Sequence, residues 1–114
     1  MADEKTTSLD FSVDRTNLYR EESFTDLRVG SIRRLTPVKP DGSPDKARKT
    51  IFVGHSNLFT PNGPLPIQNV IQAKELQQAI KKFPEAMKSA TERLVEEVKK
   101  QKEKQESRII VPGR

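Results

Sequence analysis

Two strands and the turn between them are predicted by residues 50–71, which read Thr50-Ile-Phe-Val-Gly-His-Ser-Asn-Leu-Phe-Thr-Pro-Asn-Gly-Pro-Leu-Pro-Ile-Gln-Asn-Val-Ile71. Residues 50–59 are rich in side chains that are favoured on a pleated sheet. Alternation along this strand places Ile51, Val53 and His55 on one side and Phe52 on the other. Residues 60–63 have proline and Asn-Gly where a β-turn needs them, so the chain reverses there and a third short strand ends at Ile71.

Upstream of this hairpin, residues 24–38 alternate like a further strand, with Gly30 as a candidate β-bulge. Residues 37–46 follow with three prolines and an Asp41-Gly42 pair. Such a composition cannot form regular structure, so it predicts a long hairpin loop.

Downstream of Ala73 the spacing of apolar residues changes from two to about three and a half, which predicts a helix. Pro84 interrupts this pattern and predicts either a kink or a break, and the kink is favoured because the apolar stripe keeps its phase across the proline. The stripe either covers the sheet, which is the favoured interpretation because the sheet needs a cover, or forms the seam of a homodimer. It consists of Leu76, Ile80, Phe83, Met87, Ala90 and Leu94.

Together these segments predict an α+β domain, in which a small antiparallel sheet of about three strands is packed by a kinked C-terminal helix. We expect flexible arms at both ends of the chain. The predicted boundaries are an N-terminal arm at residues 1–23, the α+β domain at residues 24–98, and a polar helix end with a C-terminal tail at residues 99–114. A length of 114 residues allows one such domain.

The composition argues against several classes of function. Cysteine is absent, which excludes a disulfide framework, a thiolate metal site and a cysteine nucleophile. His55 is the only histidine, and no spacing of carboxylates or nucleophiles around it indicates a catalytic or metal site. We therefore expect no enzymatic activity, no metal and no cofactor. No segment approaches the roughly 20 apolar residues that cross a bilayer, and the first residues lack a secretory signal, so we expect no membrane contact and a cytoplasmic location.

Apolar residues in the otherwise polar ends of the chain indicate contacts with an unidentified protein partner. Leu9, Phe11 and Val13 alternate with polar residues and would share one face of an added strand. Ile109, Ile110 and Val111 form a second apolar cluster near the C-terminus. The leading hypothesis is therefore a non-enzymatic protein-interaction or accessory module.

Basic residues around the first hairpin loop give an alternative hypothesis, nucleic-acid binding. The formal net charge is +5, and paired strands would bring several of these cations to one edge. Neighbouring residues of a strand point to opposite faces, however, so Arg33 and Arg34 cannot both join one phosphate-binding surface. The candidate residues are Arg33, Arg34, Lys46, Arg48 and Lys49.

Three parts of the chain resemble a family of short bacterial cytosolic proteins of unknown function. They are Asn17-Leu-Tyr-Arg-Glu-Glu-Ser-Phe-Thr-Asp-Leu-Arg-Val-Gly-Ser-Ile-Arg-Arg-Leu-Thr-Pro-Val38, Thr60-Pro-Asn-Gly-Pro-Leu-Pro66 and the helix of residues 73–83. The resemblance implies a bacterial, cytosolic protein and carries no activity, cofactor or binding residue onto these positions.

Overall fold

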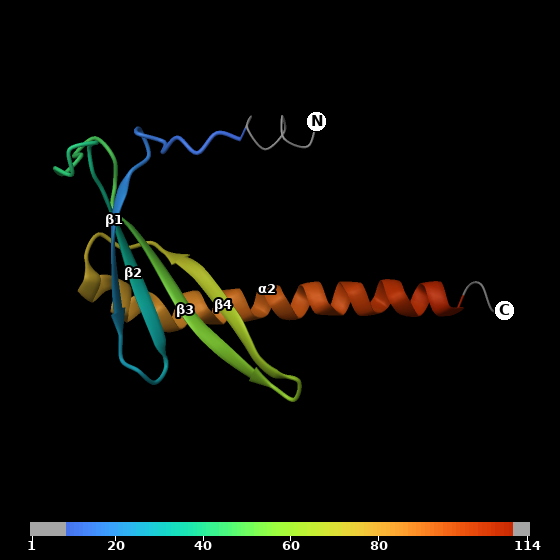
Figure 1. Cartoon of the computed structure of the whole chain (residues 1–114). Helices are drawn as coiled ribbons and strands as arrows, with labels where there is room; N and C mark the ends of the chain where they lie inside the picture. Colours follow the sequence, from blue (N-terminus) through green and yellow to red (C-terminus); the bar gives the residue numbers. More distant parts are fainter. Residues whose placement is uncertain (1–8, 111–114) are drawn as a thin grey trace.

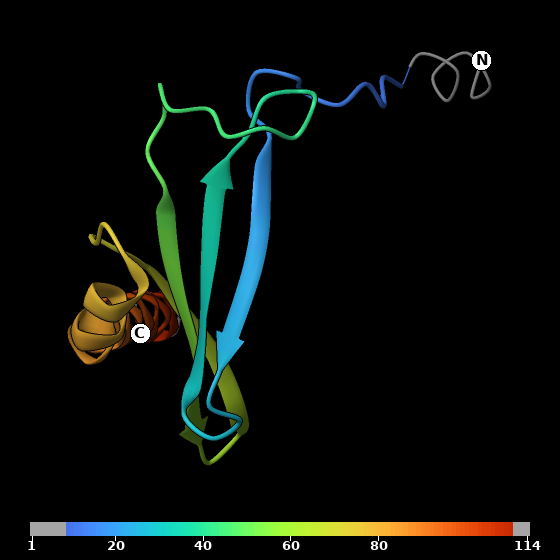
Figure 2. The ribbon, with the colours of Figure 1, turned by 90° about the vertical axis from the view of Figure 1, so that its left-hand side faces the viewer.

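A computed structural model describes the backbone of residues 9–110 and the side chains of residues 9–102. Within these residues, four antiparallel strands form one open sheet in the order β1-β2-β3-β4, and one long helix, α2, crosses one face of it (Figures 1 and 2). This confirms the predicted α+β class. The elements are β1 at Tyr19–Thr25, β2 at Gly30–Pro37, β3 at Ile51–Thr60, β4 at Gly63–Ile71 and α2 at Leu76–Ile110.

The sheet has one more strand than the sequence predicts, because residues 19–37 form a hairpin and the chain turns between Thr25 and Gly30. Asp26 Oδ1 accepts hydrogen bonds from the backbone N–H groups of Arg28, Val29 and Gly30, and Leu27 takes a positive φ of 60°. These contacts reverse the chain between β1 and β2. Gly30 therefore starts β2, and its prediction as a bulge is wrong.

Strand β1 begins at Tyr19, within the segment that the sequence assigns to the N-terminal arm. Its residues are polar and show little periodicity of their own. They join the sheet through pairing with β2, in which Glu22 lies opposite Arg34 and Phe24 lies opposite Ile32. Long-range pairing thus overrides a weak local pattern.

The core lies between α2 and the sheet. Phe52 is buried beside Ile32, Ile71 and Ala79, and a second cluster joins Ile67 to Met87 and Ala90. The predicted stripe therefore packs on the sheet, except that Ile80 is exposed and its neighbour Ala79 takes the buried position.

The helix continues through Pro84 without a break. Leu94 is the last of its residues in the core clusters, and the remaining turns project past the sheet (Figure 1). In the part of the chain that the structure describes, no helix has the length and apolar character needed to cross a membrane.

Candidate interaction face

The face of the sheet that α2 leaves uncovered, called the open face below, carries an apolar patch. Phe52 points to the helix, so its neighbours Ile51 and Val53 point to the open face. Register places Leu35 opposite Ile51 and Val70 opposite Val53, which adds both side chains to the patch. An antiparallel sheet with one wet face normally presents polar side chains to water. The open face departs from that rule at these four positions and at Phe59, which alternation along β3 places on the same face and which is 84% exposed.

A hollow of about 630 Å³ adjoins the patch on the open face, with polar and apolar residues in its lining. The register aligns Thr25, Ser31, His55 and Gln68 across all four strands, and these residues line the hollow together with Arg28 from the β1–β2 turn. Thr25, Ser31, His55 and Gln68 can each donate and accept hydrogen bonds, whereas Arg28 only donates. The sequence does not reveal this row, because its members are far apart along the chain.

His55 is the one titratable ring in the hollow. Burial lowers the pKa of its imidazole below the ordinary 6.5; the nearby positive charge of Arg33 lowers it further, while Glu21 opposes the shift. The ring is therefore neutral at pH 7. Its Nε2 atom is buried and makes no hydrogen bond within the described residues.

Arg33 and Arg34 lie on opposite faces of β2, as the sequence predicts. The Nε atom of Arg33 is 2.9 Å from Glu21 Oε1. On the helix side, Arg34 pairs with Glu22 at 2.8 Å, and its guanidinium lies 5.1 Å from the centre of the Phe24 ring. Both cations are therefore engaged within the sheet and do not share a surface.

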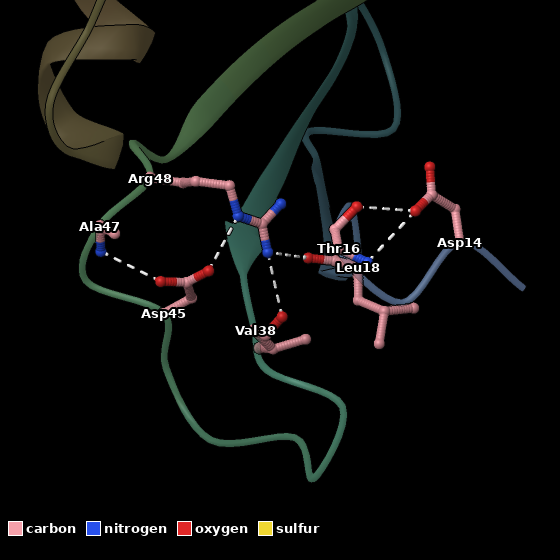
Figure 3. Close-up of polar contacts among 7 residues, drawn as sticks. All are labelled: Asp14, Thr16, Leu18, Val38, Asp45, Ala47 and Arg48. Carbon is pink, nitrogen blue, oxygen red and sulfur yellow. Dashed lines mark hydrogen bonds and ion pairs between the residues drawn. The ribbon is translucent and has the colours of Figure 1, made fainter.

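Arg48 ties the long loop to the start of β1 (Figure 3). Its Nη2 atom donates to the carbonyl oxygens of Leu18 and Val38, each at 3.0 Å, and its Nε atom donates to Asp45 at 3.0 Å. The guanidinium also lies 4.9 Å from the centre of the Tyr19 ring. The bond to Asp45 raises the pKa of Arg48 above its ordinary value. These contacts give Arg48 a structural role.

Lys46 and Lys49 complete the basic set, and both are exposed. No ion pair of either lysine occurs among the described residues. Of the five candidates for nucleic-acid binding, these two keep their charge unpaired in the described part of the chain.

The N-terminal arm leaves the sheet on the side away from α2 (Figure 2). Leu9, Phe11 and Val13 are between 59% and 85% exposed. Asp14 shapes the arm by accepting hydrogen bonds from Thr16 and Asn17 (the Thr16 bonds are drawn in Figure 3), and these bonds lower the pKa of its carboxyl group. The arm thus presents its apolar side chains to solvent.

At the other end of the chain, Ile109 and Ile110 form the last residues of α2. Their side chains, and the whole of Val111, lie outside the described residues.

An apolar groove of about 370 Å³ separates the β1–β2 hairpin from the first turns of α2. Phe24, Val29 and Ile32 line one side. Ile80, Phe83 and Pro84 line the other. The sequence placed Ile80 and Phe83 in the packed stripe and gave no sign of a groove, because the groove depends on where the hairpin overhangs the helix.

Comparisons of the chain with protein-family models, with curated proteins and with solved structures found no match. The resemblance to a family of short bacterial cytosolic proteins therefore stays a prediction.

Proposed function

We propose that this chain is a non-enzymatic protein-interaction module that binds its partner through the open face and the N-terminal arm. The observation that carries the proposal is the apolar patch of Leu35, Ile51, Val53 and Val70, on a sheet face that no second layer covers among the described residues. Water is a poor environment for such a patch, so a partner that covers it gains free energy.

The size of the patch indicates that the arm is also needed. Full burial of an exposed aliphatic side chain contributes about 1.5–3 kcal/mol. Val70 is 50% exposed and the other three are more buried, so covering the patch contributes on the order of 2–3 kcal/mol. Association itself costs at least about 4 kcal/mol. The more exposed Leu9, Phe11 and Val13 supply the larger share of the apolar surface that a partner can bury.

A matched pair of variants on β4 tests the proposal. Val70→Glu places a charge on the open face, and Leu65→Glu places the same charge on the helix side of the same strand, where Leu65 is 37% exposed. A third variant lacks residues 1–13, which precede the Asp14 turn. Circular dichroism first establishes that each variant is folded. Tagged proteins are then used to capture partners from native lysate, with and without nuclease.

We expect a stoichiometric protein partner that survives nuclease, is lost with Val70→Glu and with the arm deletion, and is kept with Leu65→Glu. Identical partners for all variants would contradict the proposal. Capture that depends on nucleic acid, and that fails when Lys46 and Lys49 are both changed to Gln, would support the alternative of nucleic-acid binding, because each neutralised phosphate releases counterions.

A further inference from the structure

Helix α2 carries a second apolar stripe beside the one that packs on the sheet. Ile80, Val95 and Val98 are each 51–55% exposed, and Pro84 and Thr91 lie between them on the same side of the helix. At about 100° per residue these positions cluster within roughly 60° of one another, about a quarter turn from the buried stripe. One side of α2 therefore has an apolar surface that its own sheet does not cover.

This second stripe begins at the apolar groove. Ile80 and Pro84 belong to both features, and the hairpin residues Phe24 and Val29 face them across the groove. The groove is thus an apolar recess at one end of an exposed apolar stripe.

The other end of the stripe lies on the part of α2 that projects from the sheet. From Val95 to Ile110 the helix extends about 24 Å beyond its last core contact at Leu94. This end of the helix has no core contact of its own, and most helical stability in proteins comes from the packing of an apolar face. The projecting part, which ends in Ile109 and Ile110, therefore benefits from a helical neighbour.

We propose that α2 pairs antiparallel with α2 of a second copy of this chain, so that the C-terminal end of each helix, at residues 109–110, reaches the apolar groove of the other. A two-fold axis relates such partners, so the stripe of one copy packs against the same stripe of the other. The two sheets lie on the same side of the helix pair, so the axis must fall beyond Leu94, where the sheet ends. Val95 and Val98 are the exposed apolar residues at that point.

The spacing along the helix fits this arrangement. From the midpoint of Val95 and Val98 it is about 13 residues back to Phe83 and Pro84 in the groove, and about 13 residues forward to Ile109 and Ile110. An antiparallel pair centred on the two valines therefore brings the apolar tip of one copy to the groove of the other. The tip cannot reach its own groove, because Pro84 and Ile109 are about 38 Å apart on one helix.

The contact area sets the expected strength. Helices that overlap over residues 83–110 share about 40 Å, and a strip about 10 Å wide gives roughly 400 Å² of footprint on each copy before the hairpin is added. A stable interface of standard size buries about 800 Å² per partner. The dimer is therefore expected at the weak end of the range, with a dissociation constant in the micromolar range. It uses the side of the sheet opposite to the open face and does not depend on the proposed function.

Oligomeric state tests the pairing first. Sedimentation equilibrium of the full chain should show a monomer–dimer equilibrium, and Val98→Glu should weaken it at least tenfold by placing like charges at the axis. Val70→Glu is the matched control, since Val70 is similarly exposed but lies on the open face; it should dimerise as the wild type does. Two results would overturn the proposal. One is a wild-type chain that stays monomeric at about 200 μM, which is well above a micromolar dissociation constant. The other is a Val98→Glu variant that dimerises as strongly as the wild type.

Cross-linking tests the register. Because the sequence contains no cysteine, single cysteines report one contact each. A mixture of Pro84→Cys and Ile109→Cys chains should form a mixed disulfide under mild oxidation, whereas Ile109→Cys mixed with Ser89→Cys should not, since Ser89 lies on another side of α2. A dimer in which position 109 links to position 89 and not to position 84 would refute the groove as the site of the tip.

Discussion

Replacement of Phe52 by alanine is expected to remove much of the stability of the fold. Phe52 is 1% exposed and packs against Ile32, Ile71 and Ala79 between β3 and α2. Loss of a buried phenyl ring costs about 3–5 kcal/mol, because transfer free energy is lost and a cavity remains. A domain of this size has about 5–10 kcal/mol of stability in total. The melting temperature should therefore fall by roughly 15–30 °C.

Phe59→Ala provides a matched control on the same strand. Phe59 is 84% exposed, so the same chemical change leaves no cavity and costs about 1 kcal/mol or less, mainly through strand preference. Urea unfolding followed by far-ultraviolet circular dichroism gives both values. The reasoning would be refuted if the two variants lost equal stability, because the cost would then come from the strand and not from the core beneath α2.

Further perturbations test the turn, the hollow and the loop. Gly30→Ala should destabilise more than Gly54→Ala, because its added Cβ would clash with the backbone oxygen of His55, whereas that of Gly54 meets side chains that can shift by tenths of an ångström; chemical denaturation ranks the two. The folded state holds the pKa of His55 below 6.5, so wild-type stability should be full above about pH 6.5 and fall as the pH drops through that value. His55→Gln should flatten this dependence, and thermal melts that show the same slope for both proteins would contradict it. Arg48→Lys keeps the charge but not the planar contact to two carbonyls and the Tyr19 ring. The backbone N–H of Asp45, which donates to the Pro37 carbonyl, should then exchange faster with solvent, and unchanged exchange would argue against the clamp.

Local patterns along the chain account for the parts of the fold that the sequence predicts. The Thr60–Gly63 turn, strand β3, the loop after Pro37 and the helix after Ala73 all follow from turn chemistry or from the spacing of apolar residues. The sequence analysis missed the turn between β1 and β2, although Asp26 was visible in the sequence. An aspartate that caps three backbone N–H groups leaves no periodic signal, and only the folded turn reveals its role.

The candidate surfaces depend on long-range placement to different degrees. The exposure of Leu9, Phe11 and Val13 agrees with the pattern of an apolar arm. The apolar patch on the open face could not be foreseen. Leu35, Val53 and Val70 come together only through the register of β2, β3 and β4.

The sequence by itself determined the class of the fold, the separation of Arg33 from Arg34 and the helical stripe, because turn propensity and the periods of strand and helix are local properties. Only the tertiary structure decided that β1 joins the sheet and that the hydrogen bonds of Arg48 hold the long loop. It also decided that, among the described residues, one sheet face and one side of α2 remain uncovered. Those outcomes depend on contacts between residues distant in the chain, whose free energies no local pattern contains.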